Sequence, residues 1–380
     1  MLDQVADLYN LVKIVLVNDG KSDLDSWLAN QLQQNKSEIL QKGCLIDYST
    51  ESNYYLRHSK DKEDIFTSIH NLLQEAQIPA DLVHFCTGNL LNKQNYNAYT
   101  SIKKAENNNF LPFKSAFFKD FWCSQTLSFH KNYSENYGKT NKNKYFSCLN
   151  GRQRKHREYT KPYIVLNNLL DIWVCTFVWS GIIVDDYSSP EQITSHTIQP
   201  ENFYKVFDDT YYDIITETLT GEESNFNWWQ EVFITEKIWR SIYYKRPFLV
   251  IGNKHTIKLL QELGFKTFNK ILFDESYDDL DNWQLRTYNV LEQNKSITEK
   301  YTLQQLEDII NSSEMSEILQ YNYNQINKLA DIYRQVRWTQ ILHDCYRNHS
   351  KNTLSSIKTQ LYYKYITGTP KGHLSVCDFN

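Results

Sequence analysis

Short apolar runs alternate with helical patterns in the first third of the chain. Residues 11–17 have the sequence LVKIVLV and residues 80–86 the sequence ADLVHFC, and both runs predict strands. Between them, residues 22–34 and 64–77 place apolar side chains at the spacing of one helix face. Alternation of strands and helices at these lengths is typical of a parallel α/β layer. We therefore expect an α/β unit in this part of the chain.

A second series of the same kind follows residues 132–143, which are polar and without period and which we interpret as a linker. Strands are expected at residues 145–149, 173–179, 212–216 and 247–251, and helices at residues 156–170, 235–245 and 255–263. Pro162 should limit how early the first of these helices becomes regular, and Gly264 should end the last one. The pattern predicts two α/β domains, which a length of 380 residues also favours.

From residue 297 to about residue 343 the pattern is helical, with no strands between. The apolar residues at helical spacing include Leu303, Leu306, Ile309, Ile310, Ile318 and Leu319. An isolated helix of this kind would leave a wide apolar stripe in water, so these residues need a partner surface. The side chains expected to pack against the first domain or the seam between the domains are some of Ile326, Leu329, Ile332, Val336 and Leu342. Packing on the second domain alone is the alternative.

Composition and charge exclude few classes of protein. A net charge of −4 argues against a dedicated nucleic-acid binder, whose surface is normally basic. The N-terminal segment lacks the basic and apolar regions of a signal peptide, and no run approaches the ~20 apolar residues of a membrane span. The seven cysteines form no CxxC pair, which favours reduced thiols over a zinc site or a disulfide framework. We therefore expect a soluble, cytoplasmic protein.

A basic loop lies between the strand predicted at residues 145–149 and the helix that follows it. The loop has the sequence NGRQRKHR and contains Arg152, Arg154 and Arg157. In an acidic protein this local excess of positive charge indicates an anion, and the carboxyl end of a strand is where α/β sheets bind ligands. A solvated basic turn is the alternative. An enzyme acting on nucleic acid is less favoured, because no long basic face accompanies the loop.

A second candidate site lies at the start of the helix predicted at residues 235–245. Thr235 is well suited to cap this helix, and Glu236 and Lys237 occupy its first turn. Free N–H groups and the positive end of the helix dipole favour phosphate there. A carboxylate that accepts from sugar hydroxyls, beside a cation for phosphate, indicates a nucleotide-sugar. A purely structural first turn is the alternative.

The order of these elements resembles the donor-binding motif of the α1,3-fucosyltransferase family. In that family the motif runs Ala-Phe-Glu-Asn, a short loop, Tyr-Val-Thr-Glu-Lys, a helix, and a strand with Val-Pro and a glycine. This chain has Ile-Thr-Glu-Thr at residues 215–218, Phe-Ile-Thr-Glu-Lys at residues 233–237, Arg-Pro at residues 246–247, and Gly252. The resemblance covers roughly residues 145–282, is strongest at the Thr-Glu-Lys segment, and does not extend into the N-terminal third.

The resemblance implies a glycosyltransferase of the GT-B type, with two Rossmann-like domains and a C-terminal helical extension. Residues 1–140 would form the acceptor-side α/β domain, residues 141–296 the domain that binds the nucleotide-sugar donor, and residues 297–380 a helical region that braces the two lobes. The implied enzyme is a fucosyltransferase-like hexosyltransferase. It would move a sugar from a nucleotide-diphosphate sugar, with GDP-fucose as one candidate, to a glycan, polysaccharide or glycoconjugate acceptor.

Carried over residue by residue, the resemblance assigns the nucleotide to the first turn of the helix and to the basic loop. Glu236 would accept hydrogen bonds from the ribose hydroxyls, and Lys237 would contact the diphosphate. Arg157 would hold the phosphate, with Arg152 and Arg154 as the other candidates.

The sugar and the base are assigned to the neighbouring segments. Glu217 would contact the sugar, Asn227 would match an asparagine of the loop, and Phe233 would take the place of a tyrosine that flanks the base. Two departures from the family, Thr218 for asparagine and Phe233 for tyrosine, leave the donor sugar and its nucleotide open.

The chemistry implied by the resemblance needs neither a metal nor another cofactor. Transfer with inversion requires a base that takes the acceptor proton, and cations with a helix dipole that stabilise the leaving diphosphate. The base would come from the first domain, where the resemblance ends; His84 and His130 are candidates, and the catalytic residue stays unassigned. The alternative is a non-catalytic protein on the same scaffold that binds a nucleotide-sugar or a glycan.

Overall fold

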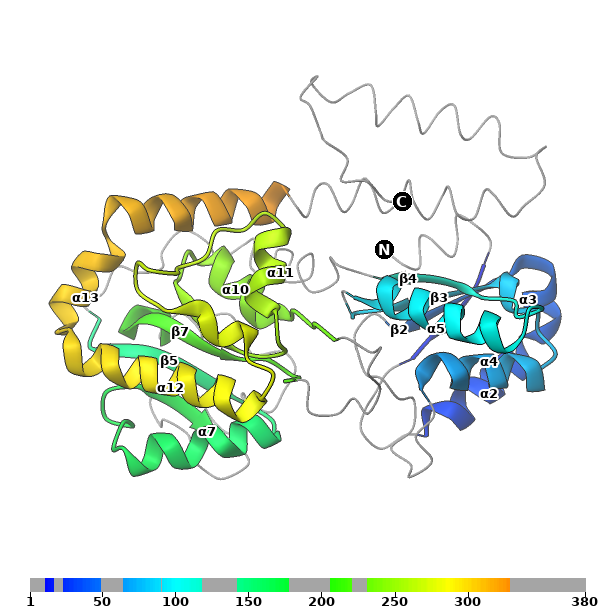
Figure 1. Ribbon diagram of the computed structural model, residues 1–380, viewed down its shortest axis with the longest axis horizontal. Coiled ribbons are helices and arrows are strands. Elements are labelled where there is room, and N and C mark those ends of the chain that lie inside the picture. Colours follow the sequence, from blue (N-terminus) through cyan, green and yellow to red (C-terminus); the bar gives the residue numbers. More distant parts are fainter. Residues whose placement is uncertain are drawn as a thin grey trace, which may run out of the picture.

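The computed structural model describes residues 11–16, 23–48, 64–89, 91–117, 142–177, 206–220 and 231–328. These residues form a mixed α/β structure with two four-stranded sheets, in which all strand pairings are parallel. Figure 1 shows the first sheet and its helices in blue and cyan and the second sheet and its helices in green and yellow. The α/β class expected from the sequence is confirmed.

The first sheet has its strands in the order in which they occur along the chain. They are β1 (Val12–Val15), β2 (Cys44–Tyr48), β3 (Val83–Thr87) and β4 (Lys114–Phe117). The connecting elements are α2 (Leu24–Gln34), α3 (Lys36–Lys42), α4 (Ile65–Glu75), the short 3-10 turn η1 (Ala80–Leu82) and α5 (Asn92–Glu106). Helix α2 packs on α4, and Phe66 of α4 contacts Tyr96 and Tyr99 of α5. The strand order does not reverse within the described part of this sheet.

The second sheet does reverse direction. Its strands are arranged β6-β5-β7-β8 and span β5 (Lys144–Asn150), β6 (Val174–Phe177), β7 (Thr210–Thr216) and β8 (Phe248–Ile251). From β5 the chain passes to β6 on one side and later to β7 on the other. The switch point, where α/β sheets bind ligands, therefore lies between the carboxyl ends of β5 and β7.

The helices of the second sheet lie on both of its faces. Figure 1 shows α7 (Lys155–Leu166) and α12 (Trp283–Lys300) on one side and α10 (Glu236–Tyr243) and α11 (Thr256–Glu262) on the other. Right-handed crossovers that run in opposite directions produce this arrangement. Helices α7 and α10 both begin at the carboxyl edge of the sheet, because each follows a strand of the sheet along the chain.

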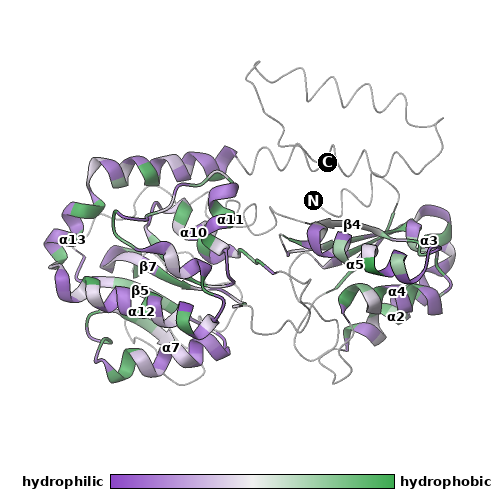
Figure 2. Cartoon of the chain, in the orientation of Figure 1, coloured by the Kyte–Doolittle hydropathy of each residue, from purple (hydrophilic) through white to green (hydrophobic). Residues whose placement is uncertain are grey.

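Each sheet is accompanied by its own cluster of buried apolar side chains. The first cluster includes Phe66 and Phe85, and the second includes Phe146 and Trp239. Figure 2 shows hydrophobic residues along the strands and hydrophilic residues on the outer sides of the helices. Full burial of one such side chain contributes about 1.5–3 kcal/mol, so these clusters are the main stabilising term. All residues of β7 are buried, as expected for a parallel strand covered on both faces.

Side-chain caps explain where several helices begin. Asp64 accepts a hydrogen bond from the backbone N–H of Thr67 at 2.9 Å, at the start of α4. Thr302 and Gln305 form a reciprocal capping box at the start of α13 (Leu303–Ile310). Loss of one such cap costs about 1 kcal/mol.

Gly264 ends α11, as the sequence predicts. Its φ of +87° is in the left-handed region, which glycine adopts without strain. The N–H of Gly264 donates to the carbonyl of Gln261, and the N–H of Phe265 donates to the carbonyl of Leu260. These two bonds satisfy carbonyl groups of the last helical turn.

Three local expectations differ from the structure. Strand β2 and helix α5 were not anticipated, because β2 is too short to show a period and α5 has the polar sequence NKQNYNAYTSIKKAE. Residues 80–82 form a 3-10 turn instead of strand. The expectation that Pro162 delays helix α7 is wrong, since the helix is regular from Lys155 and contains Pro162. The hydrogen bond that this proline cannot make would end on the carbonyl of Glu158, an exposed residue that water can reach.

The C-terminal part of the described residues is helical, as expected. It consists of α12, α13 and a helix over residues 313–328, and it includes the 3-10 turn η3 (Glu275–Asp279) before α12. Leu306, Leu319 and Ile326 belong to the buried cluster of the second sheet. The other residues proposed to brace the first domain, Leu329, Ile332, Val336 and Leu342, lie outside the described residues. None of the described helices combines the length and apolar character that crossing a membrane requires.

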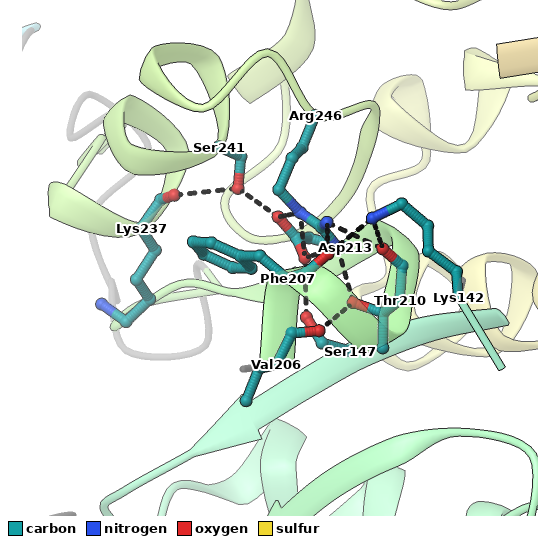
Figure 3. A network of polar contacts seen from close by, with 9 residues as sticks. All are labelled: Lys142, Ser147, Val206, Phe207, Thr210, Asp213, Lys237, Ser241 and Arg246. Carbon is teal, nitrogen blue, oxygen red and sulfur yellow. Dashed lines mark hydrogen bonds and ion pairs between the residues drawn. The ribbon is translucent and has the colours of Figure 1, made fainter. Parts of the chain in front are cut away.

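A network of buried charges lies inside the second sheet (Figure 3). Asp213, in the middle of β7, accepts hydrogen bonds from Nη2 of Arg246 at 2.9 Å, from Ser147 at 2.6 Å and from Ser241 at 2.7 Å. Burial acts to raise the pKa of Asp213, but the charge of Arg246 and these hydrogen bonds outweigh it, so the pKa lies below its ordinary value. The network therefore holds β5, β7 and α10 together through an ionised carboxylate.

Candidate functional site

Glu217 lies directly after β7, at the switch point of the second sheet, and is completely buried. Its Oε1 accepts a hydrogen bond from the backbone N–H of Thr235 at 3.0 Å, and its Oε2 accepts one from the Thr235 hydroxyl at 2.6 Å. The Nζ of Lys237 lies 3.5 Å from the same Oε2. The carboxylate of Glu217 thus fastens the end of β7 to the start of α10 instead of facing solvent.

The first turn of α10 presents the two residues that the sequence assigns to the nucleotide. Thr235 caps the helix, and its hydroxyl oxygen accepts a hydrogen bond from Nζ of Lys237 at 2.8 Å. Glu236 lies 3.1 Å from the same Nζ, and its side chain is 40% exposed. Partial burial acts to raise the pKa of Glu236, but the charges of Lys237 and Arg240 outweigh it, so the pKa lies below its ordinary value. An ionised carboxylate and an ammonium group therefore stand side by side at the helix start.

The ends of three strands are joined by polar side chains. Thr216, the last residue of β7, donates its hydroxyl to Oδ1 of Asn150, the last residue of β5, at 2.6 Å. The backbone N–H of Asn150 donates to the hydroxyl of Thr176 in β6 at 2.9 Å. These residues are buried, so the hydrogen bonds fix the positions of the strand ends relative to one another at the switch point.

His156 and Arg157, in the first turn of α7, bind backbone carbonyls across the sheet. Nε2 of His156 donates to the carbonyl of Glu217 at 2.9 Å. Nη2 of Arg157 donates to the carbonyls of Thr216 at 2.9 Å and Glu217 at 3.3 Å, and Nη1 donates to the carbonyl of Arg152 at 3.0 Å. Most donors of Arg157 are therefore used inside the protein. The buried guanidinium of Arg157 is therefore held against the backbone at the end of β7.

The surroundings shift the pKa of both side chains in the same direction. Burial, and then the charge of Arg157, lowers the pKa of His156 to about 3, so the imidazole is neutral at physiological pH. Burial, and then the charge of Arg154, lowers the pKa of Arg157 to about 10, which leaves its guanidinium protonated.

The remaining site residues predicted from the sequence differ in position. Arg154 is half-buried at the N-cap of α7, and Arg152 is an exposed residue of the preceding loop. Phe233 is 3% exposed and precedes the cap of α10 by two positions. Asn227 lies outside the described residues, and so does His130. His84 is a half-buried residue of β3, in the first sheet.

The structure therefore brings most of the assigned residues into one continuous arrangement. Arg157 contacts the backbone of Glu217, the side chain of Glu217 holds Thr235, and Thr235 contacts Lys237, which in turn pairs with Glu236. The sequence patterns do not single out Asn150, Thr216 or His156 as part of this arrangement. For His156 a signal was present, because it stands beside Arg157 in the basic loop.

Two helix N-termini and three cationic side chains lie at this edge of the sheet, beside the carboxylates of Glu217 and Glu236. Two helices begin there, and the N-cap residue of α7, Arg154, offers its first N–H groups no side-chain acceptor. The dipoles of α7 and α10 add to the charges of Arg154, Arg157 and Lys237. Among the residues that the structure describes, this is an arrangement suited to a phosphate or diphosphate group.

The turn after β3 of the first sheet contacts the segment that leads into α10. The backbone N–H of Val232 donates to Oδ1 of Asn89 at 3.4 Å. Leu91 packs against the buried cluster of the second sheet. The carboxyl end of β3 therefore lies next to the segment that leads into α10.

Acid is expected to destabilise the protein through His156. The ordinary pKa of 6.5 applies to the unfolded chain, and the folded value is about 3. Because only the unfolded chain binds a proton between these values, the stability from the neutral imidazole is complete above pH 6.5. It is lost as the pH falls toward 3, by up to about 1.4 kcal/mol per pH unit. Urea unfolding from pH 7.5 to 4.5 should show a shallower loss in H156Q than in the wild type; equal slopes would contradict the assignment.

No group of three or more potential metal-ligating side chains occurs within the described ranges.

Comparison with protein-family models, with curated proteins and with solved structures finds no match, so the function has to be inferred from the geometry of the site itself.

Proposed function

We propose that this protein is a glycosyltransferase of the GT-B type, which transfers a sugar from a nucleotide-diphosphate sugar to a hydroxyl group of a glycan or glycoconjugate. The observation that carries the proposal is the convergence of the N-termini of α7 and α10 with Arg154, Arg157 and Lys237 at the switch point of the second sheet. Such a site favours a diphosphate, and Glu236 beside it offers an acceptor for ribose hydroxyls. The resemblance of residues 233–237 to the fucosyltransferase motif supports the same function.

In this proposal two Rossmann-like domains face each other and the second holds the donor. Lys237 binds the diphosphate with the help of the α10 dipole, and Arg154 is a second cation at the start of α7. Arg157 contributes the positive charge of its buried guanidinium, which is held at the end of β7. Glu236 binds the ribose, and Glu217 holds the turn that carries both nucleotide-binding residues.

The proposed reaction is a single displacement with inversion. The acceptor oxygen attacks the anomeric carbon and gives up its proton to a base, while the bond from that carbon to the diphosphate oxygen breaks. Negative charge develops on the leaving diphosphate, and Lys237 and the dipole of α10 are proposed to stabilise it. The base is proposed to come from the first sheet, whose β3 end lies beside the segment leading into α10.

The proposal is tested by a donor screen. Guanosine, uridine and cytidine diphosphates and their sugar conjugates, GDP-fucose first among them, are added to the purified protein at about 100 times an assumed Kd. A ligand that binds only the native state then stabilises it by about 2.7 kcal/mol, which appears as a rise in Tm. At least one nucleoside diphosphate should raise the Tm, whereas the free nucleosides should not. No shift with any nucleotide would overturn the proposal.

A non-catalytic binding protein is the second candidate. The complete burial of the Glu217 carboxylate favours it, because the residue assigned to the sugar is already bonded inside the protein. The two functions are separated by turnover. Release of the nucleoside diphosphate from a bound donor, in the presence of a panel of glycan acceptors, indicates the transferase, and tight binding without release indicates the binding protein.

A further inference from the structure

We infer that His156 is a positioning residue of the donor site, which holds the turn between β7 and α10 in the geometry that binds the nucleotide. The inference rests on the proposed function for the nature of the ligand. The contact itself, between the imidazole and the carbonyl of Glu217, is a feature of the structure. His156 does not belong to the motif that carries the resemblance.

A short series of contacts links His156 to the nucleotide-binding residues. Nε2 donates to the carbonyl of Glu217 at 2.9 Å, and the carboxylate of the same residue binds both the N–H and the hydroxyl of Thr235. The hydroxyl of Thr235 contacts Nζ of Lys237 at 2.8 Å. Since Glu217 is held at its backbone on one side and at its side chain on the other, movement of its carbonyl displaces the start of α10.

Arg157 makes a second, longer hydrogen bond to the same carbonyl. Its Nη2 lies 3.3 Å from the Glu217 carbonyl but 2.9 Å from that of Thr216, so its shorter bond goes to the preceding residue. The bond from His156 is the shorter of the two that reach Glu217. A carbonyl can only accept, so the imidazole must carry its proton on Nε2 to make this contact.

The experiment uses two amide variants of the full chain that differ by one methylene group. In H156Q the side-chain nitrogen reaches the position of Nε2, whereas in H156N it falls short. H156L serves as the apolar variant. H70L is the control, because His70 is a half-buried histidine that packs on Tyr99 and Phe113 of the first cluster and is remote in the chain from the donor site.

Two quantities are measured at matched folded fractions. The first is the Kd of the nucleoside diphosphate that raises the Tm of the wild type most. It should increase at least tenfold in H156N and H156L, and stay within threefold of the wild type in H156Q and H70L. The second is amide hydrogen exchange in peptides that span residues 213–220 and 231–238. It should be faster in H156N than in H156Q, with other peptides of the second sheet unchanged.

The outcomes distinguish the role of His156 from the proposed function. A Kd within twofold of the wild type in H156N, or a tenfold loss in H156Q equal to that of H156N, would overturn the inference even if the Tm falls. If the wild type binds no nucleotide, the proposed function fails, and hydrogen exchange still decides the role of His156. Faster exchange confined to the two peptides supports the positioning role, and unchanged exchange refutes it.

Discussion

Replacing Lys237 with methionine is expected to lower sugar transfer by about 10²- to 10³-fold while the protein still folds, as found when one preorganised electrostatic donor is removed from an active site. The Lys237 side chain is 18% exposed and lies at the start of α10, where the helix dipole is positive. Figure 3 shows its side chain pointing away from the buried network around Asp213. Glu217 keeps both hydrogen bonds from Thr235 in the variant, so the turn stays closed.

The measurement is kcat/KM with the donor identified in the screen, together with the affinity for the nucleoside diphosphate and for free pyrophosphate. K237M should weaken binding of both, whereas E236Q should weaken binding of the nucleotide alone, because Glu236 is assigned to the ribose. K258M removes the same charge from an exposed position of α11 and should behave as the wild type. Unaltered turnover in K237M would exclude Lys237 from the site and with it the proposed donor position.

Replacing Arg246 with methionine is expected to destabilise the second sheet by about 3–5 kcal/mol, the usual cost of leaving a buried charge without its partner. Arg246 is 2% exposed, and its guanidinium binds Asp213 through Nε and Nη2. Nη1 also donates to the carbonyls of Phe207 and Thr210 at 3.1 and 2.8 Å. Of the hydrogen bonds described above, the carboxylate of Asp213 then keeps those from the hydroxyls of Ser147 and Ser241.

The free energy of unfolding from urea titration measures this effect. K254M, which breaks the exposed pair of Lys254 with Asp281, should cost less than about 1 kcal/mol and serves as the matched control. D213N/R246M should recover part of the loss, because the unpaired charge is then absent. If the free energy of unfolding falls no more in R246M than in K254M, the buried pair of Arg246 and Asp213 does not stabilise the fold.

The acid sensitivity expected from His156 should be separable from that of Asp213. Asp213 has a lowered pKa in the folded state, so its contribution is present above the ordinary carboxylate pKa of 3.8 and is lost as the pH falls below it. The contribution of His156 is lost at higher pH, from 6.5 downward. We therefore expect the free energy of unfolding to fall in two steps on acidification, the first from His156 and the second from Asp213. H156Q should remove the first step.

The periodic patterns identified most elements near the candidate site correctly. The helix after Thr235 was predicted because Ile238 and Ile242 recur on one face, and both are buried in the structure. Its cap was predicted from the residue type at position 235, and the Thr235 hydroxyl makes that contact. These features depend on residues within one or two turns of each other, so the order of side chains along the chain is enough to specify them.

The relative positions of the site residues could not be obtained in that way. The resemblance assigned Arg157 to the phosphate, yet its Nη2 donates to the carbonyls of Thr216 and Glu217, about sixty positions later in the chain. Glu217 was assigned to the sugar, and the structure encloses its carboxylate at the start of α10. The first finding follows from the pairing of β5 with β7 and the second from the packing of α10 against β7, and no local pattern encodes either of them.

By itself the sequence determined the α/β class, the helix that begins after Thr235, and the gathering of positive charge in the loop after residue 150. Only the tertiary structure decided that β5 and β7 lie side by side with a reversal of strand order between them, and that their ends meet through Asn150, Thr216 and His156. The physical reason is that element type follows from contacts between residues close in the chain. Strand order follows from how distant apolar faces are buried together, and a binding site at a switch point exists only once that order is set.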